Sequence, residues 1–417
     1  MASATPAFSI RWATLKTGDA AGERLPLLCW KGPRSIPDPH IARYILAALR
    51  PSVVPNTIEA MLYGIGRGLI WCQERRINLV ERAVGGSMLT SVELSVLANH
   101  MRRGSRVAAV DRTTAAIRYS AFISYVLWIV EPAVQRIART QDRVVALRGL
   151  EAFRKAAHAV RPKRPGPAAA ENPGKVGMLT PTQRELFLRV IVPGAPENPF
   201  RADLQARNYA YLLVAFTLPV RAGELQSLKV RDIKFSSDPA TMTIHRRHDD
   251  PDDKRRRSAA VKTRARVFEL EERTRKALYT WIMDVRRDRD VFPNAAKGPY
   301  VFVNEDGDAI TAHGISSMFQ TLRTAHPSLP SDLTTHFLRA DWNCRWVKLV
   351  DDEAKELRPE DRLQHNRDSR DKQIYMNGWS DQSKMPEHYA KAMIRALAND
   401  KNLKHQRMIL GKENAPE

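Results

Sequence analysis

The chain is long and strongly basic. It has 417 residues, enough for two or three domains with apolar cores, and a formal net charge of +21 from 67 Lys and Arg against 46 Asp and Glu. This excess favours a polyanionic partner, with nucleic acid ahead of an anionic membrane, although a basic soluble protein without such a partner would share the composition. The three cysteines are scattered outside any CxxC motif, which argues against a disulfide scaffold or a structural zinc site.

Membrane insertion and secretion are not expected from the sequence. The apolar run at 211–216 is far shorter than the roughly 18 residues of a transmembrane span. The N-terminus lacks a basic region followed by an apolar core, so no secretion signal is predicted. We therefore expect an intracellular, cytoplasmic protein that makes no membrane contact.

The N-terminal part of the chain is predicted to be helical. Residues 1–37 mix short β-like pieces with Gly and Pro and are interpreted as an extension of unknown role. From residue 38 the apolar residues recur with helical spacing, and capping signals such as the box at 90–93 mark helix starts. Residues 38–160 are therefore predicted to form a compact domain of four or five helices. Basic residues cluster around one connection between helices and could form a solvated face or a DNA contact: Arg102, Arg103, Arg106, Arg112 and Arg118.

A linker separates this domain from a second one. The segment 161–175 is rich in Pro, Gly and Ala and has no periodicity, which is typical of a linker. Its Arg161, Lys163 and Arg164 would suit a strap lying along phosphates. The sequence TPTQ at 180–183 is a strong helix start, so a second domain begins after the linker.

The second domain is predicted over 176–393 and mixes helices with a few strands. Helices are expected over 181–192, 202–217 and 312–325, with strand-like segments at 266–270 and 300–303. The predicted fold class is mainly α with a small antiparallel β-sheet. The remaining tail, 394–417, is amphipathic near its start and is a candidate contact with another protomer.

Cations, hydrogen-bond donors and one tyrosine are spread over the second domain in four groups. The groups are Arg221 with Glu224, Lys262, His336 with Arg339, and Trp379 with Tyr389. Each is ordinary alone, but the four occur in order, together with VFVNEDGDAIT at 301–311. In this combination they resemble the tyrosine recombinase (phage integrase) family over residues 38–393.

The resemblance implies a two-domain DNA clamp, with a helical core-binding domain and a catalytic domain. It implies a site-specific recombinase or integrase that cuts and rejoins DNA through a 3′-phosphotyrosyl intermediate, without metal, cofactor or ATP. The implied partners are double-stranded DNA with inverted-repeat-like target sites and further copies of the chain, as a tetramer on paired sites.

The residue types suit this chemistry. Cleavage of a phosphodiester needs a nucleophile, neutralisation of the phosphorane and a proton for the leaving 5′-oxygen. Arginine holds non-bridging oxygens with a planar, permanently charged fork, and a lysine among cations can act as the acid. By resemblance, Tyr389 is the nucleophile, Arg221 and Arg339 bind the phosphate, and Lys262 is the general acid. His336 is an acid or base near the nucleophile, and the indole N–H of Trp379 donates to the phosphate. Glu224 positions Arg221 or His336. The further residues expected to contact DNA are Arg102, Arg103, Arg106, Arg161, Lys163, Arg164, Arg255, Arg256 and Arg257.

Other interpretations of single residues stay open. Arg221 and Glu224 could form a surface ion pair, and another cation near Lys262 could be the acid. The remaining alternatives are core packing for Trp379, a rival nucleophile in Tyr375, and an incidental position for His388 beside the tyrosine.

The chain also departs from the family pattern. Pro219 stands where glycine is usual, and Ala340 stands where histidine is frequent. The spacing from Trp379 to Tyr389 is one residue longer than is usual in the family. The interval before Trp379 contains an additional charged segment, 351–372, which is interpreted as a solvated extension of two helices or, alternatively, as a regulatory or protomer contact. None of these departures removes a catalytic group.

Three other functions share these features. A type IB topoisomerase or a hairpin telomere resolvase would use the same chemistry on the same fold, and a DNA-binding protein could keep the fold without activity.

Overall fold

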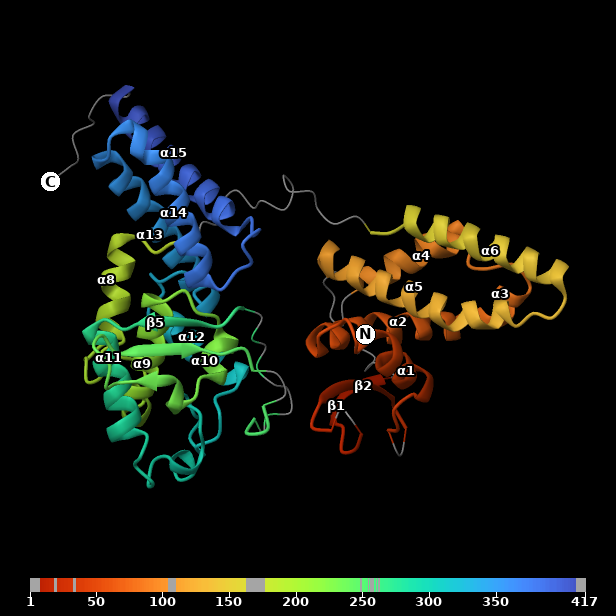
Figure 1. The fold of residues 1–417 in the computed structure, drawn as a ribbon, viewed down its shortest axis with the longest axis horizontal. Helices are drawn as coiled ribbons and strands as arrows, with labels where there is room; N and C mark the ends of the chain where they lie inside the picture. The colour runs from red at the N-terminus through yellow and green to blue at the C-terminus, as the bar shows by residue number, and fades with distance from the viewer. Residues whose placement is uncertain are drawn as a thin grey trace. The chain divides into compact units, whose positions relative to one another are not determined.

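The computed structural model describes residues 8–18, 21–32, 35–103, 110–162, 177–247, 250–253, 255, 259, 261 and 263–409. They divide into two compact units, one within Met1–Asn172 and the other within Pro173–Glu417 (Figure 1). Each unit has its own buried cores.

The first unit combines a β-hairpin with a set of helices. Strands β1 (Phe8–Thr14) and β2 (Arg24–Trp30) pair antiparallel, with Phe8 opposite Trp30. The helices are α1 (Pro39–Tyr44), which continues as a π-helical turn (Ile45–Leu49), α2 (Pro55–Glu74), α3 (Leu79–Val84), α4 (Ser91–Arg102), α5 (Arg112–Gln135) and α6 (Thr140–Ala159). The predicted helices of this region are thus present.

Helices α2 and α5 cross closely because α2 presents glycines to α5. A Cβ atom on Gly64 would lie 2.4 Å from the backbone oxygen of Arg118, and one on Gly68 would lie 2.2 Å from the ring of Phe122. Helix α5 is also long and apolar enough to cross a membrane by length and composition alone, which the sequence reading did not anticipate. Its residues Tyr119, Phe122 and Val126 are buried in the core of the first unit.

The hairpin at the N-terminal end is packed against the helices. Phe8 and Leu28 are buried in one core with residues of α2. The indole of Trp30 donates to the carboxylate of Asp38 at 2.8 Å, and that carboxylate also caps α1. The described part of the predicted N-terminal extension therefore belongs to the first unit.

The second unit contains the three-stranded sheet and the remaining helices. The strands β3 (Ile233–Lys234), β4 (Thr241–Ile244) and β5 (Arg266–Glu269) lie in that order and pair antiparallel. The helices are α8 (Pro181–Val190), α9 (Ala202–Thr217), α10 (Ala222–Ser227), α11 (Glu272–Tyr279), α12 (Ala312–Ala325), α13 (Thr335–Glu356), α14 (Pro359–Asn377) and α15 (Met385–Ile409). The predicted fold class, mainly α with small antiparallel β-structure, is confirmed.

Helix α9 occupies the centre of the second unit. Its residues from Tyr211 to Phe216 are all buried, so it has little face left for solvent. The chain turns at 304–307: Val303 and Ala309 form an antiparallel bridge, and Gly307 has a φ of +85°. A Cβ atom there would lie 2.2 Å from the nitrogen of Ala295, which explains the glycine.

The charged segment 351–372 is helical. It forms the last turns of α13 and most of α14, which confirms the two-helix interpretation (Figure 1). The segment is only partly solvated, however. Ser369 is buried, and its carbonyl accepts a hydrogen bond from the indole of Trp346 at 3.2 Å.

The helix that carries Tyr389 continues into the predicted C-terminal tail. Helix α15 runs to Ile409, so most of the predicted tail continues the same helix. Ile394, Leu403 and Met408 are exposed along it.

Candidate active site

Four elements of the second unit bring the predicted site residues together. The N-terminal end of α10 carries Arg221, the first turns of α13 carry His336 and Arg339, the loop after α14 carries Trp379, and α15 carries Tyr389. The positive charges of Arg221 and Arg339 both act to lower the pKa of the Tyr389 phenol. Lys262, the predicted general acid, lies outside the described residues.

Arg339 is almost completely buried, with 2% of its surface exposed. Its guanidinium donates to the carbonyl of Pro219 and to that of Asn377, the latter at 3.0 Å, and it lies 5.7 Å from the centre of the Trp379 ring. Burial, and then the charge of Arg221, lowers its pKa to about 9. The hydrogen bonds to carbonyls leave its positive charge largely uncompensated, and a bound anion would stabilise it.

Arg221 provides a second cationic group. One of its terminal nitrogens, Nη1, is buried without a hydrogen-bond partner and lies 3.7 Å from Glu224 Oε1. Burial lowers the pKa of this guanidinium, and Glu224 opposes the shift. A buried N–H group without an acceptor is uncommon in folded proteins, and a phosphate oxygen is the acceptor that best suits a guanidinium.

Arg266 is a site residue that the sequence analysis missed. Its side chain is buried and forms a two-pronged ion pair with Glu224, at 2.7 Å and 3.3 Å. Its Nε atom donates to the carbonyl of Met376 at 2.7 Å, at the end of α14. In the sequence it is one of several cations that follow Lys262, and nothing local distinguishes it.

Glu224 therefore acts mainly on Arg266. Its Oε2 atom also accepts from the backbone N–H of Arg221 at 2.9 Å, and Thr263 donates to its Oε1 atom. Burial alone would raise the pKa of Glu224, but the charge and hydrogen bonds of Arg266, with those of Thr263 and Arg221, hold it below its ordinary value. The prediction that Glu224 positions Arg221 is consistent with the backbone contact.

We expect Glu224→Gln to destabilise the second unit by about 3–5 kcal/mol, because it leaves the charge of Arg266 buried without its partner. Denaturant unfolding at neutral pH measures this. Glu272→Gln, which removes a carboxylate from an exposed pair with Arg275, is the matched control and should cost far less stability, because solvent screens the pair. Because the folded-state pKa is lowered, the contribution of Glu224 is present above its unfolded pKa and is lost as pH falls through the folded value. Equal losses in the two variants would contradict this assignment.

Tyr389 is buried against Trp379. Their rings stack with centres 5.9 Å apart and planes at 13°, in a small apolar cluster with Cys344, Ile374 and Met393. Burial raises the pKa of the phenol, while Arg339 and Arg221 oppose that rise. Trp379 thus packs in a core and also faces the guanidinium of Arg339. Its role as a donor to the phosphate stays a prediction.

The neighbours of Tyr389 differ in their placement. Tyr375, the rival nucleophile, is exposed, and its hydroxyl accepts from the backbone N–H of Val267 on β5 at 3.3 Å. His388 lies edge-on to the Tyr389 ring, with centres 5.5 Å apart. His336 lies on α13 one turn before Arg339, and partial burial together with the two arginines lowers its pKa. This shift favours the neutral form of the imidazole.

A network of buried amide side chains lies next to Arg339. Asn343 on α13 donates to the Arg339 carbonyl at 2.8 Å and to the Asn377 side chain at 3.0 Å, and Gln373 donates to Asn343 at 2.9 Å. All three amides are buried. The network fixes the carbonyl of Asn377 that accepts from Arg339.

Gly378 then turns the chain from α14 toward Trp379. Its φ is +62°, and a Cβ atom would lie 2.8 Å from Thr263 and 2.9 Å from Arg266. Its carbonyl accepts from the backbone N–H of Arg264 at 3.1 Å. The end of α14 is therefore tied directly to the segment that follows Lys262.

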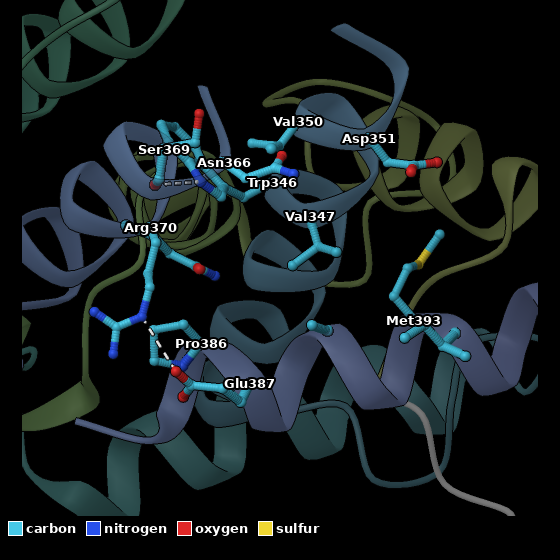
Figure 2. A pocket seen from close by; sticks show the side chains of 13 residues that line it. Trp346, Val347, Val350, Asp351, Asn366, Ser369, Arg370, Pro386, Glu387 and Met393 are labelled. Carbon is cyan, nitrogen blue, oxygen red and sulfur yellow. Dashed lines mark hydrogen bonds and ion pairs between the residues drawn. The ribbon is translucent and has the colours of Figure 1, made fainter. Parts of the chain in front are cut away.

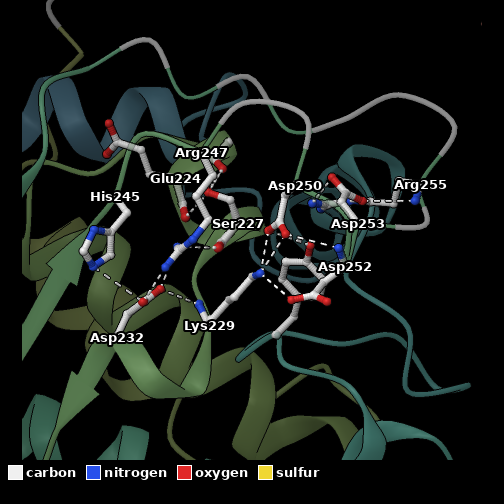
Figure 3. Close-up of polar contacts among 12 residues, drawn as sticks. Glu224, Ser227, Lys229, Asp232, His245, Arg247, Asp250, Asp252, Asp253 and Arg255 are labelled. Carbon is white, nitrogen blue, oxygen red and sulfur yellow. Dashed lines mark hydrogen bonds and ion pairs between the residues drawn. The ribbon is translucent and has the colours of Figure 1, made fainter. Parts of the chain in front are cut away.

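Several predicted DNA contacts can be placed. Arg102, Arg103 and Arg161 are exposed in the first unit. Arg255 is instead engaged: it pairs with Asp253 at 2.8 Å and donates to the carbonyl of Ile310 at 3.0 Å (Figure 3). Its geometry does not support the predicted role. The others lie outside the described residues: Arg106, Lys163, Arg164, Arg256 and Arg257.

A second ionic cluster anchors the segment after β4. Lys229 is buried, and its ammonium contacts Asp250 at 2.8 Å and Asp252 at 2.7 Å (Figure 3). Asp232, next to it, holds Arg247 through two hydrogen bonds. Within the described ranges, no group of three or more His, Cys, Asp and Glu side chains is arranged to hold a metal ion.

Comparison with known proteins gives similarity to solved structures only. No protein-family model matches the chain, and no curated protein matches it. The chain is similar to the Tn1549 transposon integrase in complex with transposon right-end DNA, at 16% identity and a TM-score of 0.48, covering 86% of this chain and 98% of that one. It is also similar to the XerH site-specific recombinase bound to palindromic difH substrate, at 16% identity and a TM-score of 0.42, covering 88% and 93%. For the XerA recombinase the identity is 14% and the TM-score 0.34, covering 91% and 99%.

Proposed function

We propose that this protein is a tyrosine site-specific recombinase or integrase that acts on double-stranded DNA. The observation that carries the proposal is the placement of Tyr389 beside Arg339 and Arg221, two poorly compensated guanidiniums with lowered pKa values. A chain with a net charge of +21 adds the long-range attraction that a DNA substrate requires.

The reaction follows from these groups. The Tyr389 oxygen attacks a DNA phosphorus and loses its proton, while the bond from phosphorus to the 5′-oxygen breaks. Arg339 and Arg221 bind the non-bridging oxygens, whose negative charge grows in the transition state. The leaving 5′-oxygen takes a proton, and Lys262 is the expected donor. The 3′-phosphotyrosyl bond conserves the energy of the broken one, so attack by a 5′-hydroxyl from another strand rejoins DNA without ATP.

The other site residues have supporting roles in this proposal. Trp379 stacks on the nucleophile, and its indole N–H is the expected donor to the phosphate. His336, whose lowered pKa favours the neutral imidazole, can accept a proton near the nucleophile. Glu224 pairs with Arg266 and accepts a hydrogen bond from the backbone N–H of Arg221, which keeps Arg221 in place.

The proposed substrate is a duplex with inverted-repeat-like sites that binds to both units. Arg102, Arg103 and Arg161 are the described residues proposed to contact its backbone. Strand exchange needs a pair of sites, so we propose a tetramer of this chain. The exposed apolar residues along α15, such as Ile394 and Leu403, support a contact with another protomer. A cytoplasmic, nucleoid-associated protein fits this substrate.

DNA binding should depend steeply on salt. If Arg102, Arg103 and Arg161 each neutralise a phosphate, replacing one of them by Ala should make the dependence on salt less steep. The slope of the logarithm of the association constant against the logarithm of the salt concentration should decrease in magnitude by about 1. Affinity for a short duplex, measured between low and physiological salt, checks this. Arg75→Ala removes a cation stacked on Trp71 and is the control. An unchanged slope in all three variants would remove these residues from the interface.

The reaction products separate a recombinase from its alternatives. Duplexes bound by the protein can first be enriched from a random-sequence library, and plasmids with two copies of the enriched site then serve as substrates. A recombinase produces deletion or inversion between the sites in the presence of EDTA and without ATP. Relaxed circles alone would indicate a type IB topoisomerase, closed hairpin ends a telomere resolvase, and binding without any product a non-catalytic DNA-binding protein.

A further inference from the structure

The start of α15, which carries Tyr389, contacts both α13 and α14. Beneath its first turns lies a pocket of about 340 Å³ between α13, α14 and α15, lined by residues including Val347, Gln373, Ala390 and Met393 (Figure 2). A helix over such a pocket lacks part of the close packing that fixes a side chain in a protein core. Of the residues of α15, Tyr389 and Met393 are buried in an apolar cluster with Trp379.

Arg370 on α14 reaches across the edge of this pocket to the start of α15. Its Nε atom donates to the carboxylate of Glu387 at 3.1 Å (Figure 2). Its Nη2 atom donates to the carbonyl of Ser383 at 3.3 Å. The hydroxyl of Ser383 accepts the backbone N–H of Met385, the first residue of α15. One guanidinium therefore holds both the segment before the helix and its first turn.

The same helix also positions the arginine of the site. The carbonyl of Asn377, less than two turns after Arg370 on α14, accepts from Arg339 at 3.0 Å. Residues of α14 thus contact both the nucleophile helix and the phosphate-binding group. The distance between nucleophile and clamp is set through α14, most of which is the additional charged segment.

We propose that Arg370 is a positioning residue for Tyr389, acting through Glu387 and the Ser383 carbonyl. The pair is partly exposed, with 37% and 51% of the side-chain surfaces accessible, so it contributes little to global stability. Its effect is on geometry instead, because a small displacement of an attacking atom costs a large factor in rate. The inference rests on the proposed function for its kinetic readout, but the contact itself does not.

The kinetic test uses the full-length protein and a nicked duplex carrying the enriched site. Arg370→Ala should slow formation of the covalent adduct at least about ten-fold at saturating protein, with unchanged DNA affinity and melting temperature. Arg370→Lys should be less impaired than Arg370→Ala. The exchange Arg370→Glu with Glu387→Arg should recover part of the rate lost in Arg370→Glu alone, because it restores the ion pair. A merely structural role would instead lower the melting temperature of Arg370→Ala. Arg367→Ala, an exposed cation on the same helix, is the matched control and should cleave at the wild-type rate.

Hydrogen exchange of the DNA-free protein tests the contact separately. Arg370→Ala should raise the exchange rate of the backbone N–H groups over 387–393, and Arg367→Ala should not. If wild type forms no adduct but this difference is seen, the proposed function fails and the contact stands. The inference is overturned if Arg370→Ala cleaves within two-fold of wild type, or if exchange over 387–393 is the same in both variants.

Discussion

Replacing Tyr389 by Phe is expected to abolish cleavage while leaving DNA binding intact. The substitution removes only the hydroxyl, the atom that attacks phosphorus, and keeps the ring that stacks on Trp379 at 5.9 Å. Without a nucleophile no covalent adduct forms, so the loss exceeds the 10²–10⁴-fold, approximately, typical of removing an acid or base. Denaturing gel electrophoresis of the protein with a labelled nicked duplex measures the adduct.

Tyr375→Phe is the matched control for this experiment. It removes a hydroxyl from the exposed tyrosine on α14, whose contact is with the backbone of Val267. Adduct formation should remain near the wild-type rate. If Tyr389→Phe still forms the adduct while Tyr375→Phe does not, Tyr375 is the nucleophile and Tyr389 is not.

The second large effect is expected for Arg339→Lys. Lysine keeps the positive charge but cannot donate to the carbonyls of Pro219 and Asn377 and still present a fork to a phosphate. Losing one such preorganised donor set should lower the cleavage rate by about 10²–10³-fold, measured in a single turnover at saturating protein. DNA affinity should change little, because many other cations contribute to it.

Arg323→Lys controls for the replacement itself. Arg323 also donates to a backbone carbonyl, that of Leu333 at 2.6 Å, on α12 rather than in the site. Its variant should bind and cleave like wild type once folded. If Arg339→Lys cleaves within ten-fold of wild type, Arg339 does not bind the phosphate in the transition state.

Local sequence signals predicted the elements well where caps and periodicity agree. The helices expected over 202–217 and 312–325 have the observed bounds of α9 and α12. The helix expected over 181–192 ends at Val190, within the usual uncertainty of helix ends. The capping box at Thr180, with its partner Gln183, is formed as predicted.

Helix α14 shows what the sequence could not reveal. Its composition is polar, which indicated a solvated surface, yet Ser369, Gln373 and Asn377 are buried. Their side chains or carbonyls bond to residues of α13 far away in sequence. A polar side chain that is buried and paired looks like an exposed one until its partners are known.

The candidate site likewise combines residues that the sequence predicted with one that only the fold reveals. Arg221, Arg339, Trp379 and Tyr389 were found because the order of motifs resembled a known family. Arg266 belongs to no such motif, and its importance follows only from its buried pair with Glu224, which depends on the fold.

The attachment point of DNA on the protein tests the central proposal most directly. Wild-type protein is incubated with a nicked duplex of the enriched site in the presence of EDTA, digested with protease and nuclease, and examined by peptide mass spectrometry. We predict one modified peptide, with a nucleotide joined through its 3′-phosphate to the oxygen of Tyr389. Attachment to another residue, a 5′-phosphate linkage, or no adduct on DNA that the protein demonstrably binds would contradict the proposal.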